Sequence, residues 1–436
     1  MRRLILLAAL MPAAIPASPA TGQENDRPAI SGQDRSRGHR MLRRLRETLE
    51  RYYYDSTYRG IDLDRHVAQT DSAIDAANSV PQMFAVLADF LGALDDSHTR
   101  FLPPGINVEV SYGWSWQMVG DDCHVVSVSE SGDAKAKGLR VGDRVLAIDG
   151  IRPVRENLST IGYVYYQLSP RPGMRVLVEH EGGERAELII NSKMTRRPPV
   201  EDLADLNNRR RYWEEAERSR PRHAWREIDS VLVWRLPAFI HQDVEIDRLM
   251  ALARQHRWLI LDLRGNSGGS VATLLRLLGH FFAEPFHAFT EVRRDSTVEQ
   301  RVLPVGDGPF MGEAIVLIDS RSASASELTS RVLQMRNRAM IVGDRSAGKV
   351  MGSYQISLTL GSVWQERVVP FGMQVTVVDG VMPDSSRLEK AGVIPNVAAL
   401  PTGADLAAKR DPAMQFALEM AGVKVTAAEA GKVLSR

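Results

Sequence analysis

The fold is decided by the stretch Ala314–Lys349, which reads AIVLIDSRSASASELTSRVLQMRNRAMIVGDRSAGK. Its first five residues are apolar and predict a buried strand, and the small and polar residues that follow lead into a helical pattern. Ser324 therefore lies at a strand-to-helix turn, where the positive end of the helix favours negative charge on the side chain. The small neighbours of Ser324 leave room for a substrate.

A second buried run, Met340–Gly343, follows the helix and leads to Lys349, which is 25 residues after Ser324 (349 − 324). The strand–helix–strand path returns the chain to the same end of the sheet, where the two side chains could meet. A lysine activates a serine hydroxyl only if burial lowers the lysine pKa by roughly three units. The alternative is that Ser324 caps the helix and Lys349 is an exposed surface residue.

Composition places further limits on the function. The chain of 436 residues is long enough for two or three domains with separate cores. Its 55 basic and 54 acidic residues give a net charge of +1, which removes any whole-chain argument for nucleic-acid binding. Cys123 is the only cysteine, so an internal disulfide is excluded. His241, His256 and His287 are too scattered to argue a metal site, and we expect no metal and no cofactor.

The amino terminus has the pattern of a signal peptide. Residues 1–20 combine a charged start with an apolar stretch too short to span a bilayer, and cleavage is expected near Ala20. The alternative is a buried helix. We therefore expect a periplasmic or secreted protein without a stable membrane span, with a flexible leader over residues 21–37.

Helical spacing predicts an amino-terminal helical domain over residues 38–104. Ser79 and Gln82 have the spacing of a capping box at the start of its last helix. His98 follows this helix beside Asp96, so His98 could be a base oriented by a carboxylate, or a hydrogen-bonded structural histidine.

The pattern changes from helical to alternating over residues 105–195, and the segment Ala136–Gly150 resembles the signature of a PDZ domain. The resemblance implies a domain that binds an extended carboxyl-terminal peptide as an added strand. The loop that holds the terminal carboxylate in such domains would be near Tyr112, Gly113 and Trp114. A charged connector is expected over residues 196–227.

The largest domain is expected over residues 228–402, followed by a helical tail over 403–436. Its strand Trp258–Leu263 runs into the glycine-rich segment Arg264–Ser270, which presents backbone amides at the start of a helix. Such amides could bind a phosphate, but the spacing fits neither common nucleotide-binding motif. The same geometry can form an oxyanion hole.

Six segments in this order resemble the carboxyl-terminal processing proteases, also called tail-specific proteases, which are serine peptidases with an inserted PDZ domain. The segments are Asp96–Thr99, Ala136–Gly150, Leu261–Gly269, Ser322–Glu327, Gly343–Lys349 and Glu389–Asn396. The resemblance implies an α/β (α+β multidomain) fold. Its core would consist of stacked ββα units similar to the crotonase and Clp-protease class.

The resemblance also implies catalytic roles. Ser324 matches the nucleophile, Lys349 the general base and Glu327 a carboxylate that supports the site. Gln355 matches a glutamine that orients the lysine, although it stands two positions later than in the family pattern. The amides of three residues match the oxyanion hole: Gly268, Gly269 and Ala325. Related tricorn-like peptidases use a histidine as the base, and His98 is available for that role.

These patterns predict an exported serine endopeptidase that recognises the tails of proteins with free carboxyl termini and cuts peptide bonds with a Ser–Lys pair. The alternative is a catalytically silent PDZ scaffold that binds tails without cutting them. Assembly as a homo-oligomer, or action with an adaptor protein, stays open.

Overall fold

The computed structural model describes residues 30–105, 108–196, 222–240, 243–360 and 369–434. The expected signal peptide and most of the expected connector lie outside these residues. Among the described residues, no helix is both long and apolar enough to cross a membrane.

Three helices form the amino-terminal domain: α2 (Gly32–Tyr52), α3 (Leu63–Ala76) and α4 (Val80–Gly92). A short 3₁₀ helix at Tyr58–Gly60 connects the first two. Helix α2 begins inside the segment expected to be a leader, because Ser31 and Asp34 form a capping box that the polar composition obscured. Helix α4 begins as expected, with the Ser79 hydroxyl accepting from the N–H of Gln82 at 3.3 Å.

An inserted domain (residues 108–196) follows the short strand β1 (Arg100–Leu102). Its five-stranded antiparallel sheet has the order β3-β4-β5-β6-β7, and β2 pairs separately with β8. The strands are β2 (Val108–Ser111), β3 (Trp114–Val119), β4 (Asp122–Val128), β5 (Arg144–Ile148), β6 (Gly173–Glu179), β7 (Arg185–Asn191) and β8 (Lys193–Arg196). The helices are α5 (Asp133–Ala136), α6 (Leu158–Tyr163) and a π-helical turn (Val164–Leu168).

The largest domain is built on a six-stranded sheet with the order β18-β15-β14-β11-β10-β9, parallel except for β9. Its strands are β9 (Ala224–Ile228), β10 (Val231–Arg235), β11 (Trp258–Asp262), β14 (Glu313–Ile318), β15 (Met340–Gly343) and β18 (Val397–Ala398). Leu232 packs with the helices on one face, and its neighbour Val233 packs with the carboxyl-terminal helices on the other. The central strands are apolar throughout because both faces of the sheet are covered.

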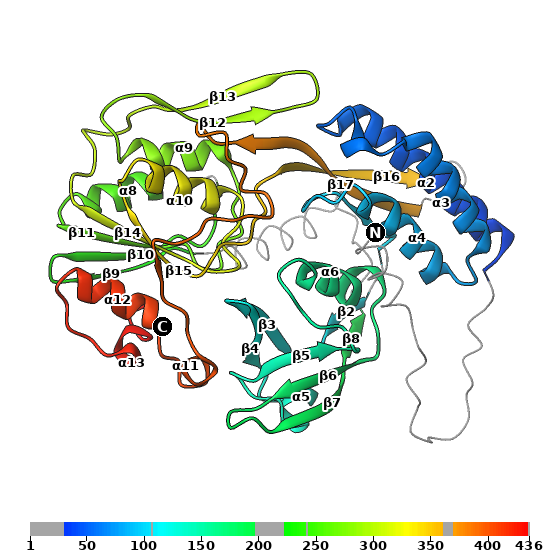
Figure 1. The fold of residues 1–436 in the computed structure, drawn as a ribbon, viewed down its shortest axis with the longest axis horizontal. Coiled ribbons are helices and arrows are strands. Elements are labelled where there is room, and N and C mark those ends of the chain that lie inside the picture. Colours follow the sequence, from blue (N-terminus) through cyan, green and yellow to red (C-terminus); the bar gives the residue numbers. More distant parts are fainter. Residues whose placement is uncertain (1–29, 106–107, 197–221, 241–242, 361–368, 435–436) are drawn as a thin grey trace, which may run out of the picture.

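Helices cover the two faces of this sheet as Figure 1 shows. Those on one face are α8 (Asp243–Ala253), α9 (Val271–Gly279) and α10 (Ala325–Met335). The carboxyl-terminal unit on the other face comprises α11 (Gly403–Ala407), α12 (Pro412–Met420) and α13 (Ala427–Ala430). Arg264 joins this unit to the sheet, because it pairs with buried Asp262 and with Asp411 at the start of α12, each at 2.8 Å.

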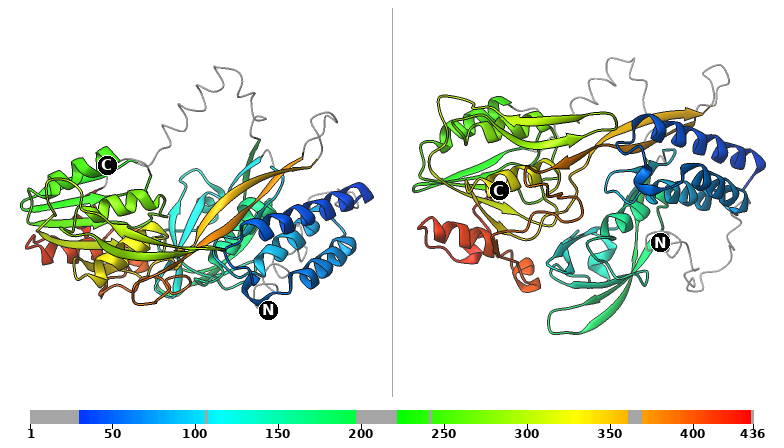
Figure 2. Two further views of the ribbon diagram at one scale, coloured as in Figure 1. Left: turned by 90° about the horizontal axis from the view of Figure 1, so that it is seen from above. Right: turned by 45° about the horizontal axis from the view of Figure 1, so that its top comes forward.

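A second sheet connects the large domain to the amino-terminal helices. Its strands are β12 (Phe286–Val292), β13 (Thr297–Val302), β16 (Gly352–Leu360) and β17 (Val369–Val381), with β1 at one edge. Strands β16 and β17 reach from the large domain to α2 (Figure 2). Strand β17 pairs with β1, so the segment that contains His98 is attached to the large domain although more than 200 residues separate them in sequence.

Candidate active site

Ser324 stands at the amino-terminal cap of α10 with φ 55° and ψ −118°. A positive φ strains a residue with a side chain, and strain of this kind is concentrated at functional sites, where surrounding contacts impose it. The N–H of Ser324 donates to the carbonyl oxygen of Lys349 at 2.9 Å and to Oε2 of Glu327 at 3.0 Å. The turn is therefore fixed by one contact with the backbone of Lys349 and one with the side chain of Glu327.

The glycine-rich loop lies directly against this turn. A Cβ atom at Gly268 would lie 2.6 Å from Cβ of Ser324, so only glycine fits there. The N–H of Gly268 donates to Oδ1 of Asn266 at 2.8 Å. In the described part of the chain, no acceptor is recorded for the N–H groups of Gly269 and Ala325. These two amides can stabilise an oxyanion that forms at Ser324.

Glu327 holds the Lys349 loop (residues 346–350) against α10. Its carboxylate accepts from Ser346 Oγ at 2.6 Å, from the N–H of Gly348 at 2.7 Å and from the N–H of Lys349 at 2.9 Å, in addition to Ser324. Glu327 is fully buried. Burial raises its pKa to about 7, and the hydrogen bonds from Ser346 and the three backbone N–H groups oppose the shift.

A second carboxylate, that of Glu389, contacts the same loop. Glu389 accepts from the N–H of Val350 at 3.2 Å and from the N–H of Ser97 at 3.0 Å. The Ser97 hydroxyl donates to Oε2 of Glu389 at 3.1 Å, and its oxygen lies 2.6 Å from Nδ1 of His98. Because the only hydroxyl proton is used by Glu389, Nδ1 of His98 donates to Ser97. This leaves the lone pair of Nε2 on His98 able to accept a proton.

The environment of His98 keeps the imidazole neutral. Burial lowers the pKa of His98 to about 4, and the charges of Lys349 and Arg100 lower it further while Asp96 opposes them. The adjacent backbone is also fixed, because Oδ1 of Asp96 accepts from the N–H groups of His98 and Thr99 at 2.9 and 2.6 Å. His98 is therefore an oriented and neutral imidazole at neutral pH.

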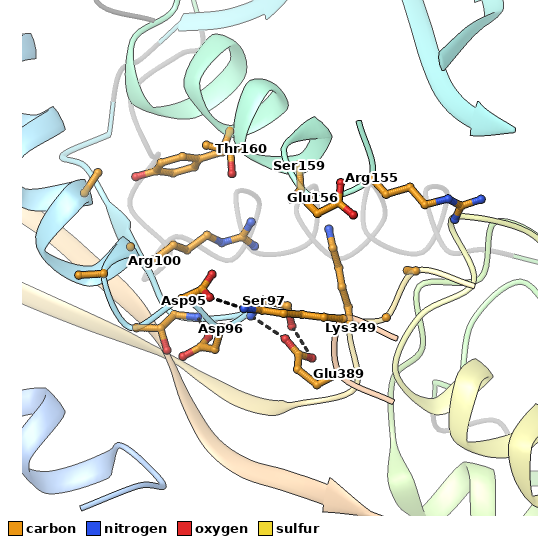
Figure 3. Close-up of a pocket in the computed structure, with 18 of the residues that line it drawn as sticks. Asp95, Asp96, Ser97, Arg100, Arg155, Glu156, Ser159, Thr160, Lys349 and Glu389 are labelled. Atoms are coloured by element: carbon orange, nitrogen blue, oxygen red, sulfur yellow. Dashed lines mark hydrogen bonds and ion pairs between the residues drawn. The ribbon is translucent and has the colours of Figure 1, made fainter. Parts of the chain in front are cut away.

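The side chain of Lys349 extends into an interdomain cavity of about 750 Å³. The cavity lies between the end of α4, the α6 region of the inserted domain and the Lys349 loop. Figure 3 shows the Lys349 side chain directed toward Glu156, while Glu389 lies beside Ser97. The Lys349 loop thus forms part of the cavity wall and also contacts the Ser324 turn.

Comparison with known proteins agrees with this geometry. The family described as "Peptidase family S41" matches residues 231–399, which include the Ser324 turn, the glycine-rich loop and the Lys349 loop. These residues form an S41 peptidase domain. The predicted membership in a serine-type peptidase family is therefore confirmed, and the mixed α/β fold agrees with it.

The S41 match extends to curated relatives. The carboxyl-terminal-processing protease of Picosynechococcus is 25% identical over 337 residues, which cover 72% of each chain. Carboxyl-terminal-processing peptidase 1 of Arabidopsis thaliana is 22% identical over 331 residues, or 72% of this chain, and the match spans 62% of that relative's length. These matches confirm the family resemblance predicted from the motifs.

Among solved structures, mature CPAF complexed with lactacystin has a TM-score of 0.65 at 16% identity. The similarity covers 92% of this chain and 99% of the CPAF chain. At this identity the comparison supports the fold alone. It extends well beyond the S41 domain and includes most of the amino-terminal helical and inserted domains.

The remaining predicted residues, on β16 and in the inserted domain, make no recorded contact with the Ser324 turn or the Lys349 loop among the described residues. Gln355 is exposed on β16, where it pairs with Gln374, and it does not line the interdomain cavity. Tyr112 and Trp114 are buried in the inserted domain on either side of Gly113, whose φ is 73°. These aromatic side chains support the loop, so a peptide would have to contact its backbone or the unpaired edge of β3.

The sequence analysis assigned no role to Ser97 or Glu389. Both residues lie in segments that supported the family resemblance, but nothing in their local pattern indicates that they meet. Their contact joins positions 292 residues apart. The only available signal was the presence of a hydroxyl and a carboxylate inside two matching motifs.

Within the described residues, no group of three potential metal ligands is found.

Proposed function

We propose that this protein is a serine endopeptidase in which Ser324 is the nucleophile. The observation that carries the proposal is the strained Ser324 turn packed against Gly268, with the unpaired amides of Gly269 and Ala325 close by. Ser324 attacks the scissile carbonyl, and the two amides stabilise the oxyanion of the tetrahedral intermediate. The general base passes the proton taken from Ser324 to the leaving amine as the C–N bond breaks, and water then hydrolyses the acyl-enzyme and regenerates the Ser324 hydroxyl.

We propose His98 as the general base, although the sequence favoured Lys349. The hydrogen bonds from Glu389 through Ser97 to His98 support this choice, because they fix the orientation and the tautomer of the imidazole. The side chain of Lys349 is directed toward Glu156 in the interdomain cavity, which also favours His98 over Lys349 in this role. Lys349 remains the alternative base, and Gln355 is not needed in either scheme.

The nucleophile can be tested with a fluorophosphonate probe that labels activated serines. Wild-type protein should be labelled and should cleave peptides, whereas Ser324→Ala should lose both properties while keeping its thermal unfolding profile. Ser72→Ala is a matched control, because Ser72 is an exposed hydroxyl on α3 outside the site. Labelling of Ser324→Ala at the wild-type rate would remove Ser324 from the mechanism, and an unlabelled wild-type protein would support a silent scaffold.

The base can be identified from the rate of acylation. His98→Ala should slow acylation by about 10²- to 10⁴-fold, whereas Lys349→Ala should have a smaller effect. The pH dependence gives an independent measurement, because kcat/KM should rise through about pH 4 if His98 is the base. A rise at about pH 7–8 that disappears in Lys349→Ala would assign the base to Lys349 instead.

The inserted domain is proposed to act as a PDZ domain that binds substrate tails. Strand β3 supports this role, because it is the edge of the five-stranded sheet and has β4 as its only sheet partner among the described strands. An extended peptide could therefore add to β3 with its carboxylate near Gly113. Gly113 faces β4 and Met118 faces away from it, so by alternation the N–H of Trp116 lies on the free edge, and a proline at Trp116 should weaken tail binding by removing that donor.

Export is proposed from the signal-peptide pattern of residues 1–20, which lie outside the described part of the chain. Amino-terminal sequencing of protein purified from the producing cells would test it. A new amino terminus near residue 21 supports export to the periplasm or the medium. A retained first segment would contradict it.

A further inference from the structure

The interdomain cavity is built from three parts of the chain that pack firmly together. The Tyr163 hydroxyl of the inserted domain donates to the carbonyl oxygen of Phe101 on β1 at 2.6 Å. Arg155 of the same domain pairs with Asp344 at 2.7 Å and donates to the carbonyl oxygen of Arg345 at 2.9 Å. These contacts hold the inserted domain against β1 and against the Asp344–Arg345 segment, and Arg155, Tyr163 and Arg345 all line the cavity.

Several charges that line the cavity already have partners. Lys390 pairs with Asp95. The carboxylate of Asp96 accepts from Thr376 Oγ1 at 2.8 Å and from the Tyr53 hydroxyl at 3.0 Å. Glu389 accepts the hydrogen bonds from Ser97 and Val350 described above. The carboxylates of Asp95, Asp96 and Glu389 therefore already bind groups of the protein itself.

Arg100 differs from these paired residues of the cavity lining. Its guanidinium group is directed into the cavity in Figure 3. In the described residues, no side-chain hydrogen bond or ion pair of Arg100 is found, and the backbone of Arg100 is held in register by β17. Asp89 also lines the cavity, and no ion pair between Asp89 and Arg100 is found among the described residues. Arg100 is an exposed residue, so its guanidinium group is accessible to a ligand that enters the cavity.

The position of Arg100 connects it to the reaction centre. It follows His98 by two residues, and the opposite wall is the Lys349 loop that holds the Ser324 turn. A peptide bound at Ser324 would therefore have part of its length beside this cavity. A guanidinium group forms strong, geometrically specific hydrogen bonds with a carboxylate.

We propose that Arg100 forms a substrate subsite that binds a carboxylate of the peptide, supplied by an aspartate or glutamate side chain or by the terminal carboxyl group. The proposal rests on the proposed peptidase function and adds a preference for acidic substrates to it. The subsite is distinct from the edge of β3, where the inserted domain would hold a tail.

Binding can be measured without turnover on the Ser324→Ala protein. The probes are fluorescent peptides of one alanine–leucine sequence with a single glutamate moved along it, together with their glutamine and carboxyl-terminal amide forms. At least one glutamate or free-acid peptide should bind about 10-fold or more tightly than its neutral form. Arg100→Gln should abolish that difference. Arg140→Gln, which removes an exposed guanidinium outside the cavity, should retain it.

A charge exchange makes the test specific. Arg100→Glu should reverse the preference, so that a lysine in place of the favoured glutamate binds more tightly than the glutamate itself. The glutamine and amide peptides distinguish the two sources of the carboxylate, because only one of the two replacements should weaken binding through Arg100. Circular dichroism and thermal unfolding of each variant show that it is folded, and Arg100→Lys should retain part of the preference.

Equal binding of acidic and neutral peptides by a folded Ser324→Ala protein would overturn the subsite. A preference that persists in Arg100→Gln and Arg100→Glu would assign carboxylate recognition to another part of the chain. The proposed peptidase function fails separately, if wild-type protein neither cleaves these peptides nor reacts with the serine probe. Because binding is measured on the inactive variant, that failure leaves the test of Arg100 intact.

Discussion

Glu327 and Asp89 are two carboxyl groups whose pKa burial raises to about 7. Their surroundings differ. Glu327 accepts four hydrogen bonds, three of them from backbone N–H groups of the Ser324 turn and the Lys349 loop. Asp89, at the wall of the interdomain cavity, has a buried Oδ1 that accepts none among the described residues. The two carboxyl groups therefore have a similar pKa, although Glu327 is fully hydrogen-bonded and Asp89 has a buried oxygen without a hydrogen bond among the described residues.

The difference shows what a buried carboxyl group contributes. Removing Glu327 leaves backbone donors without an acceptor, whereas removing the charge of Asp89 leaves nothing unpaired. Glu327 is thus part of the structure that holds the Ser324 turn. Asp89 is a local destabilising feature whose effect depends on pH.

The largest effect is expected for Glu327→Ala, which leaves four donors unpaired and should reduce the free energy of unfolding by about 4 kcal/mol. Glu327→Gln should reduce it by about 2 kcal/mol, because the Ser346 hydroxyl can turn to accept while the N–H of Gly348 cannot. Urea denaturation measures both values. Peptidase activity should fall with them, since Ser324 loses a contact that fixes its turn.

Equal stabilities of Glu327→Gln and the wild-type protein would contradict this account of the site. Glu299→Gln is a suitable control, because Glu299 is an exposed carboxylate on β13 outside the site. Its free energy of unfolding should stay within about 0.5 kcal/mol of the wild-type value.

The next effect concerns catalysis through Glu389. Glu389→Gln replaces a carboxylate with a neutral amide behind Ser97 and should lower kcat by about 10- to 100-fold, with a small change in stability. Ser97→Ala should have a similar effect, because Nδ1 of His98 loses its acceptor. The double variant Ser97→Ala/Glu389→Gln should have a kcat little lower than that of Ser97→Ala alone if Glu389 acts on His98 only through Ser97.

Kinetics over a range of pH separate this role from a structural one. The rise of kcat/KM attributed to His98 should shift in both Glu389→Gln and Ser97→Ala, whereas a packing defect would lower the rate at every pH. Additive losses in the double variant would show that Glu389 and Ser97 act independently.

A smaller effect of opposite sign is expected for Asp89→Asn. The folded pKa of Asp89 lies above its ordinary value of 3.8, so the native state binds the proton more tightly and stability falls as pH rises from about 4 to 7. Since Asp89 is partly exposed, the variant should be more stable than wild type by about 1–2 kcal/mol at pH 8. The two proteins should be equally stable at pH 3. A destabilised Asp89→Asn at pH 8 would reveal a partner for the carboxylate.

The smallest effect is expected at Ser324, whose turn Glu327 holds in a strained conformation. Ser324→Gly and Ser324→Ala should both be inactive, but glycine accepts a positive φ without strain. The glycine variant should therefore be more stable than the alanine variant by about 1 kcal/mol. Thermal unfolding of the two inactive proteins gives this comparison. Equal stability would indicate that the turn relaxes when the hydroxyl is removed.

Sequence reasoning identified the parts of the site whose signal is local. An apolar strand, small residues and a helix predicted the turn at Ser324, and glycines after a buried strand predicted a loop with available amides. The structure adds that the N–H of Gly268 is already used by Asn266, so Gly269 and Ala325 are the available donors. Hydrogen-bond use of this kind has no signature in a single sequence.

The parts that could not be predicted depend on contacts between distant segments. Ser97 and Glu389 meet because β1 pairs with β17, and neither strand indicates its partner by its own pattern. The interdomain cavity arises where three parts of the chain pack together, so Asp89, which is half-buried, and Arg100, which has no side-chain partner among the described residues, could not be recognised beforehand. The early start of α2 was missed for a simpler reason, because its first turns are polar.

The single cysteine has a practical consequence for spectroscopy. Cys123 is buried on β4, and burial raises the pKa of its thiol to about 12, so it stays protonated and unreactive toward maleimides at neutral pH. Dyes can therefore be attached to new cysteines without replacing the native one. Exposed positions such as Glu181 in the inserted domain and Glu299 on β13 would place a donor and an acceptor on separate domains. Energy transfer between the dyes would then record how far those domains move when a peptide arrives.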